Sequence, residues 1–222
     1  MPADIDLLLY LPAPAQRSEA LYQALFVDGP RALLAALPHP PRRVVLVTST
    51  AVYGEFDGAW ADEDSATEPQ DFNGRLLLAG ERALAACGVP HVVARLAGIY
   101  GPGREWLLRR VREGGGCRPA FWTNRIHVQD AARMLVHLAG LAAPAACYVG
   151  VDDQPASECE VMSWLAARLG VPPPPRGDAG STMALGNRRL SNRRLRATGF
   201  TFDYPDFRRG YAGLTPAPVG GD

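Results

Sequence analysis

Short runs of consecutive apolar residues alternate along this chain with longer segments in which apolar residues recur every three or four positions. Four runs predict buried strands, because a strand covered on both faces lacks the in–out alternation of a half-exposed one. They lie at residues 5–10, 44–47, 92–96 and 147–149. Strands that alternate with helices predict a mostly parallel sheet with helices on both faces.

The helical segments are marked by their spacing and by residues that begin or end helices. Their expected bounds are 18–37, 74–87, 106–113, 128–141, 158–169 and 192–198. Gly29-Pro30 predicts an interruption of the first helix. Ser157 opens a capping box for the fifth helix, Gly170 follows its end, and Ser191 is the expected N-cap of the last.

The composition is that of an ordinary globular protein. The 222 residues are 47% hydrophobic and 21% charged, enough for one large domain or one domain with a small appendage. No apolar run approaches the roughly 18 residues of a membrane span, and the segment Met1–Asp4 does not open a signal peptide. We therefore expect a cytoplasmic protein without membrane contact. The zero net charge and the absence of a tryptophan stacking pattern argue against nucleic acid.

Two residue counts narrow the chemistry. The four cysteines stand far apart with no Cys-x-x-Cys pair, which predicts reduced thiols and neither a zinc site nor a redox motif. All 23 basic residues are arginine, so this chain has no lysine. Mechanisms that need a lysine amine are excluded for it, because a guanidinium stays charged.

Three motifs, in order, carry a family resemblance. They are Thr48–Gly54 (Thr-Ser-Thr-Ala-Val-Tyr-Gly), Arg95–Gly103 (Arg-Leu-Ala-Gly-Ile-Tyr-Gly-Pro-Gly) and Arg125–Ala132 (Arg-Ile-His-Val-Gln-Asp-Ala-Ala). Together with residues 26–34 and the arginine-rich segment 187–196, they resemble the extended short-chain dehydrogenase/reductases. This is the NAD-dependent epimerase/dehydratase family, which acts largely on nucleotide sugars. The resemblance extends from about residue 4 to residue 214.

The resemblance implies an α/β fold: an incomplete doubly wound, Rossmann-type parallel sheet with a small C-terminal α+β lobe. Residues 1–103 would form a partial NAD(P)-binding domain. Residues 104–214 would combine the substrate-type lobe with returning Rossmann elements. Residues 215–222 are expected to be a disordered tail.

The resemblance also implies site residues. Ser49 would hydrogen-bond the reacting oxygen. The residues expected to line NAD or NADP are Leu11, Pro12, Thr48, Ala97 and Gly98. Tyr53, Arg104 and Arg125 would bind a small polar or nucleotide-sugar substrate. Structural interpretations stay open, since Ser49 can simply end a strand, Tyr53 can pack a loop and Arg104 can be solvated.

Two departures from the family pattern limit this expectation. The family opens with a strand, Gly-x-x-Gly-x-x-Gly and a helix, whereas this sequence opens at what resembles the fourth strand. The positions of the family's catalytic Tyr-x-x-x-Lys hold Asn73 and Leu77 or, one residue earlier, Phe72 and Leu76. We therefore do not expect the family's proton transfer, and we expect this form to be inactive.

Three hypotheses follow for the chain. In the first, which we favour, the natural protein is longer and binds NAD(P). In the second, it is a non-catalytic binding or scaffold protein, and a partner or a second copy covers the exposed apolar edge at residues 5–10. In the third, it is a decaying gene product that folds poorly.

Overall fold

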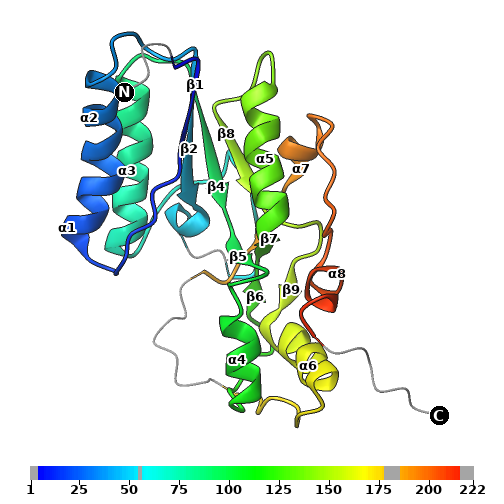
Figure 1. Ribbon diagram of the computed structural model, residues 1–222. Coiled ribbons are helices and arrows are strands. Elements are labelled where there is room, and N and C mark those ends of the chain that lie inside the picture. The colour runs from blue at the N-terminus through cyan, green and yellow to red at the C-terminus, as the bar shows by residue number, and fades with distance from the viewer. Residues whose placement is uncertain (1–4, 55–56, 178–185, 216–222) are drawn as a thin grey trace. The chain divides into compact units, whose positions relative to one another are not determined.

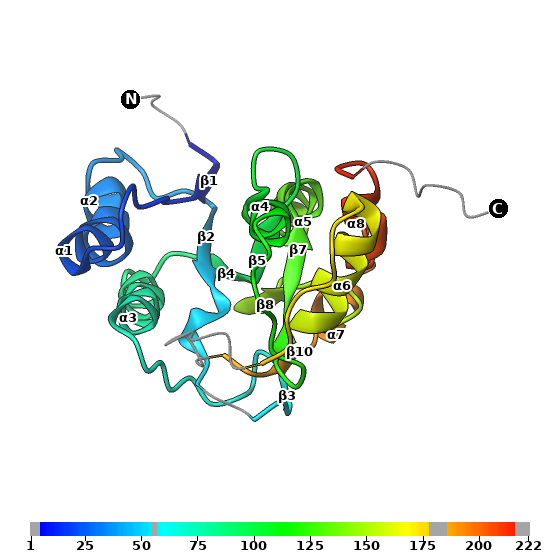
Figure 2. The same ribbon diagram turned by 90° about the horizontal axis from the view of Figure 1, so that it is seen from below.

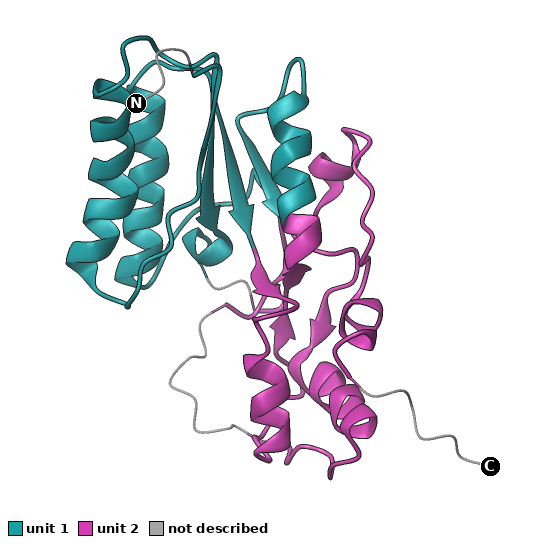
Figure 3. Ribbon diagram, in the orientation of Figure 1, with its two compact units in different colours: residues 1–54, 63–96, 132–150 teal, residues 55–62, 97–131, 151–222 magenta. Residues whose placement is uncertain are grey.

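The structure is a computed structural model that describes residues 5–54, 57–177 and 186–215 (Figure 1). The chain forms two compact units (Figure 3). Unit 1 comprises residues 1–54, 63–96 and 132–150, and unit 2 comprises residues 55–62, 97–131 and 151–222. Residues 216–222, most of the expected disordered tail, lie outside the described part.

Unit 1 is built on a four-stranded parallel sheet. Its strands, in the order β1-β2-β4-β8, are β1 (Leu7–Tyr10), β2 (Arg43–Ser49), β4 (His91–Leu96) and β8 (Cys147–Gly150). All four predicted strands are confirmed. The β1 edge has one strand partner among the described residues, and Leu9 and Leu11 are 39% and 52% exposed there.

Helices cover both faces of this sheet (Figures 1 and 2). On one face lie α1 (Glu19–Tyr22), a π-helix (Gln23–Asp28), α2 (Gly29–Ala35) and α3 (Phe72–Ala86), and on the other lies α5 (Val128–Gly140). The expected interruption at Gly29-Pro30 is confirmed. Pro30 has no N–H to donate to the π-helical turn before it, and the carbonyl of Leu25 accepts a hydrogen bond from the Tyr10 hydroxyl at 2.8 Å instead.

Unit 2 combines short strand pairs with helices. Parallel pairs join β5 (Gly98–Tyr100) to β7 (Arg125–His127) and β3 (Trp60–Ala61) to β10 (Arg189–Leu190), and β6 (Trp122–Thr123) pairs antiparallel with β9 (Ala156–Ser157). Its helices are α4 (Trp106–Arg112), α6 (Glu158–Leu169), α7 (Arg193–Arg196) and α8 (Phe207–Ala212). Its core includes Leu108, Val111, Met162, Leu165 and Phe207.

The predicted capping residues of α6 and α7 can be compared with the ends of these helices in the structure. Ser157 accepts a hydrogen bond from the N–H of Glu160, and Gly170 ends α6 at φ 66°, both as predicted. The helix predicted at 192–198 is present as α7, but its N-cap is Asn192 and not Ser191, although the Ser191 Oγ accepts a hydrogen bond from the N–H of Arg193 at 3.3 Å. The backbone N–H of Ser191 is instead donated to Ala61, so Ser191 still belongs to the strand region.

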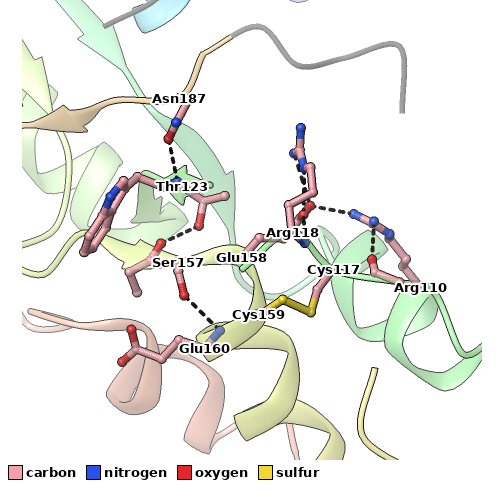
Figure 4. A network of polar contacts seen from close by, with 12 residues as sticks. Arg110, Cys117, Arg118, Thr123, Ser157, Glu158, Cys159, Glu160 and Asn187 are labelled. Atoms are coloured by element: carbon pink, nitrogen blue, oxygen red, sulfur yellow. Dashed lines mark hydrogen bonds and ion pairs between the residues drawn. A yellow bond between two sulfur atoms is a disulfide. The ribbon is translucent and has the colours of Figure 1, made fainter. Parts of the chain in front are cut away.

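The prediction of four reduced thiols was also wrong. Cys117 and Cys159 form a disulfide, although 42 positions separate them. The adjacent residues hold the same two segments together. The Glu158 carboxylate accepts hydrogen bonds from the side chains of Arg110 and Arg118 and from the Arg118 backbone N–H (Figure 4). Burial raises the pKa of Glu158, but these bonds outweigh it and hold the pKa below its usual value.

No helix in the described part of the chain is long and apolar enough to span a membrane.

Candidate functional site

Ser49 ends β2 at the carboxyl edge of the unit 1 sheet, where parallel α/β sheets bind ligands. It is the N-cap of a short 3₁₀ helix, Thr50–Val52, and its Oγ accepts a hydrogen bond from the N–H of Ala51 at 3.2 Å. The side chain is half-buried. A serine hydroxyl that accepts one bond keeps its own O–H to donate, so Ser49 can bind a ligand oxygen.

Helix α3 is held against this strand end. A Cβ atom on Gly74 would lie 2.3 Å from the carbonyl oxygen of Ala51, so only glycine allows this approach. The close contact places the first turn of α3, with Phe72 and Asn73, beside the segment that carries Ser49.

The first turn of α3 contacts an arginine from the segment that follows β1. Arg17 Nη2 lies 2.6 Å from Asp71 Oδ2 and 3.2 Å from Asn73 Oδ1, and the guanidinium lies 5.4 Å from the centre of the Phe72 ring. Sequence reasoning missed Arg17, because 54 residues separate it from Asp71. Leu77, one turn further along α3, is 3% exposed and supplies no charge.

Tyr53, expected at the substrate, lies instead in a buried hydrogen-bond network. Its hydroxyl accepts a bond from Arg95 Nη1 at 3.0 Å, and Arg95 pairs with Glu81 at 2.7 Å. Thr48 Oγ1 donates to the same Glu81 carboxylate at 2.8 Å. Tyr53 is 3% exposed, and burial raises the pKa of its hydroxyl. Its side chain is therefore enclosed by protein in this conformation.

The residues expected along the cofactor differ in exposure. In unit 1, Leu11 is exposed, Pro12 is half-buried, and the Thr48 side chain is engaged by Glu81. In unit 2, Ala97 is buried and Gly98 is exposed, with its N–H donated to the carbonyl of Asn124 at 3.3 Å.

Unit 2 carries a basic pocket around α4. Its volume is about 550 Å³, and Gly103, Arg104, Glu105, Trp106, Arg109 and Arg112 line it. Leu108 and Val111 are buried on the opposite face of the helix. The exposed Trp106 adds an aromatic surface beside the guanidinium groups. Sequence reasoning found Arg104 only, although the i, i+3 spacing of Arg109 and Arg112 was available as a signal.

Arg125, the other arginine expected at the substrate, is buried in unit 2 and 6% exposed. Its Nη2 contacts Thr123, whereas its Nη1 has no hydrogen-bond partner among the described residues. Both carboxylate oxygens of Asp152 lack one too, although Asp152 is 1% exposed. Burial raises the pKa of Asp152 to about 8, against the opposing charge of Arg125 and a weaker contact with the Gln154 backbone. The burial of Arg125 keeps it from reaching a ligand in this conformation.

Comparison with known proteins agrees with this architecture. No protein-family profile matches the chain. A Methylobacillus flagellatus protein with the provisional name NAD-dependent epimerase/dehydratase is 36% identical. Its structure matches 94% of this chain and 75% of its own, with a TM-score of 0.76. The protein YeeZ of Escherichia coli K12 is 28% identical over 91% of this chain and 75% of its own length.

A more distant structure shows the same fold. WbmG of Bordetella bronchiseptica, solved with NAD and UDP, is 20% identical and superposes with a TM-score of 0.78 over 94% of this chain and 70% of its own. The parallel sheet, the strand-end serine and the similarity to the Methylobacillus protein define a Rossmann-type protein of the short-chain dehydrogenase/reductase class. The chain belongs to the NAD-dependent epimerase/dehydratase family.

Proposed function

We propose that this protein is an atypical NAD(P)-linked epimerase, dehydratase or oxidoreductase of a small polar or nucleotide-sugar substrate. The observation that carries the proposal is Ser49 at the carboxyl end of β2, beside the closely packed first turn of α3. A bound NAD(P) would supply a hydride acceptor or donor. WbmG, which shares the fold, was solved with NAD and UDP.

Residues of each unit are candidates for contact with the nicotinamide end of such a cofactor. In unit 1, the backbone at Leu11 and Pro12 would line the ring, and the Thr48 backbone would lie beside it. In unit 2, Ala97 and Gly98 would do the same. No Gly-x-x-Gly-x-x-Gly segment for the pyrophosphate occurs in these 222 residues. We therefore assign this chain contacts to the nicotinamide half only.

Each unit offers a group of its own to a substrate. The Ser49 hydroxyl would donate a hydrogen bond to the reacting oxygen. Arg104, with Arg109 and Arg112, would bind an anionic group of the substrate in the pocket at α4. Tyr53 and Arg125 are buried, and each would pack the interior of its own unit instead of contacting the ligand.

The test is binding of NADH and NADPH, measured by the fluorescence of the reduced nicotinamide. Leu11→Asp is expected to weaken binding about tenfold or more, because it places a carboxylate at the proposed nicotinamide contact. Leu9→Asp is the matched control, since Leu9 is exposed on the same β1 edge but lies inside the strand. If neither nucleotide binds, or both variants weaken binding equally, the proposal is overturned. The protein is then a non-catalytic binding protein on this fold.

A further inference from the structure

In the proposed function, Ser49 binds the reacting oxygen of the substrate. Helix α3 provides no charged side chain for that oxygen at the two positions where the family has its catalytic pair. The helix offers Asn73 and Leu77 at the positions where the family pattern has a tyrosine and a lysine. Leu77 is buried and uncharged, and the guanidinium of Arg75, the arginine between these two positions, is bonded to the Gln70 carbonyl. Arg17 reaches the same turn of α3 from a different segment.

Arg17 is held in place from two sides. Asp71 accepts a hydrogen bond from Nη2 at 2.6 Å, and the guanidinium lies over the Phe72 ring. Phe72 is fixed in turn by Tyr22, whose ring meets it edge-on at 5.7 Å between centroids. Arg17 and Asp71 are about half-exposed, so the pair is open to solvent and ligand on one side.

The contact with Asn73 sets the direction of its amide. Asn73 Oδ1 accepts a hydrogen bond from Arg17 at 3.2 Å, which leaves the Nδ2–H groups to be donated elsewhere. No described residue accepts a hydrogen bond from Asn73 Nδ2. An amide donates hydrogen bonds but does not ionise in the accessible pH range, so it can polarise an oxygen without protonating it.

We propose that Arg17 is the cation of this site. It raises the electrostatic potential at position 73 and orients the Asn73 amide toward a ligand carbonyl or hydroxyl oxygen, which Ser49 also binds. Arg17 is then a positioning residue and Asn73 the ligand-contacting one. Asn73 and Arg17 themselves transfer no proton, so the proton that accompanies hydride transfer at this oxygen would be exchanged with solvent. The inference rests on the proposed function for its ligand but not for its test.

The test places a titratable reporter at position 73. In Asn73→Tyr, the ionisation of the introduced phenol is followed by tyrosinate absorbance, with the wild-type titration subtracted. An opposite charge within about 4–6 Å lowers a pKa by about 1–3 units. We expect the midpoint to lie at least about one pH unit lower with Arg17 present than in the Asn73→Tyr/Arg17→Gln double variant, a tenfold change in ionisation constant. Asp71→Asn is expected to lower the midpoint further.

Arg75→Gln is the matched control, because Arg75 is an exposed arginine on the same helix whose guanidinium bonds the Gln70 carbonyl. The inference is overturned if Arg17→Gln leaves the midpoint unchanged, or if Arg75→Gln moves it equally. Should the tyrosine variant not fold, Asn73→Cys in a Cys87→Ser/Cys147→Ser background gives the same reading from the pH dependence of alkylation by iodoacetamide. The titration uses no cofactor, so its failure is separate from a failure to bind NADH.

Discussion

Each unit buries an arginine beside a carboxylate, and the two pairs differ in how their hydrogen bonds are completed. In unit 1, Glu81 accepts from Nε and Nη2 of Arg95 and from Thr48, and the remaining Arg95 nitrogen reaches Tyr53. In unit 2, no ion pair joins Arg125 to Asp152, and both Asp152 oxygens lack partners in the described part. Both carboxylates are buried, but hydrogen bonds satisfy only the one in unit 1.

The difference lies in what surrounds the carboxylate. Burying a charge is unfavourable unless hydrogen bonds replace the lost water, and in unit 1 they do. In unit 2 no such bonds from the described residues replace the water, and burial raises the pKa of Asp152 to about 8. We therefore expect the Arg95–Glu81 pair to stabilise unit 1, and we expect Asp152 in unit 2 to bind a proton. The predictions below test this contrast, beginning with the largest effect.

The largest effect concerns the pH dependence of Asp152. Its folded pKa lies above the ordinary value of 3.8, so folding favours the protonated form. Its contribution to stability is therefore full below pH 4 and is lost as pH rises to about 8. At about 1.4 kcal/mol per pH unit, the loss is of order 5 kcal/mol.

Asp152→Asn removes this titration. The measurement is urea unfolding of the wild type and the variant between pH 5 and 8.5, taken as the difference between the two proteins. The free energy of unfolding of the wild type should fall relative to the variant as pH rises. Parallel curves would show that Asp152 is ionised in the folded state at every pH.

The second prediction breaks the unit 1 pair. Glu81→Gln keeps the size of the side chain but leaves Arg95 buried without a full counter-charge, which lowers stability by about 3–5 kcal/mol. Glu160→Gln is the control, because its ion pair with Arg208 at 2.8 Å is about half-exposed and is expected to contribute below about 1 kcal/mol. The measurement is urea unfolding. Equal losses in the free energy of unfolding of the two variants would contradict a stabilising role for the Arg95–Glu81 pair.

The third prediction concerns the disulfide, which strengthens unit 2 only. Closing a loop of 42 positions removes entropy from the unfolded chain worth about 2–4 kcal/mol. Cys117→Ser/Cys159→Ser should therefore lower the Tm, and a dithiol reductant should lower the Tm of the wild type but not of this variant. Cys87→Ser/Cys147→Ser is the control, since neither cysteine forms a disulfide. A wild type that carries four alkylatable thiols before unfolding would contradict the pairing.

The smallest effect is expected at the edge of the unit 1 network. Tyr53→Phe removes the bond from Arg95 Nη1 and leaves the ion pair with Glu81, so the loss should be about 1 kcal/mol. NADH affinity should not change, because the buried hydroxyl contacts no ligand in this conformation. A large loss of NADH affinity with unchanged stability would show that the Tyr53 hydroxyl contacts the ligand.

The sequence predicted the parts of the fold that depend on neighbouring residues. The four strands of the unit 1 sheet, the interruption at Pro30 and the cap at Ser157 are local in origin. The strands of unit 2 have two or three residues and pair across long separations, so no periodicity could reveal them.

The site was predictable only in part for the same reason. The strand end placed Ser49, but the partners of a buried or charged group depend on the tertiary fold. Arg17 meets Asp71 across 54 positions, and Cys117 meets Cys159 across 42. Exposure is equally non-local, which is why Arg104 lines a pocket while Arg125, in an equally polar motif, is buried.

The division of the chain into interleaved segments also constrains its synthesis. Unit 1 completes its sheet with β8, which emerges from the ribosome some 50 residues after β4. Translation adds about 5–20 residues per second, so the edge of β4 stays unpaired for several seconds before β8 is made. In unit 2, β3 waits far longer, because its partner β10 begins at Arg189. During translation this protein therefore presents open strand edges, the state in which chaperones bind newly made chains and in which crowded ribosomes favour aggregation.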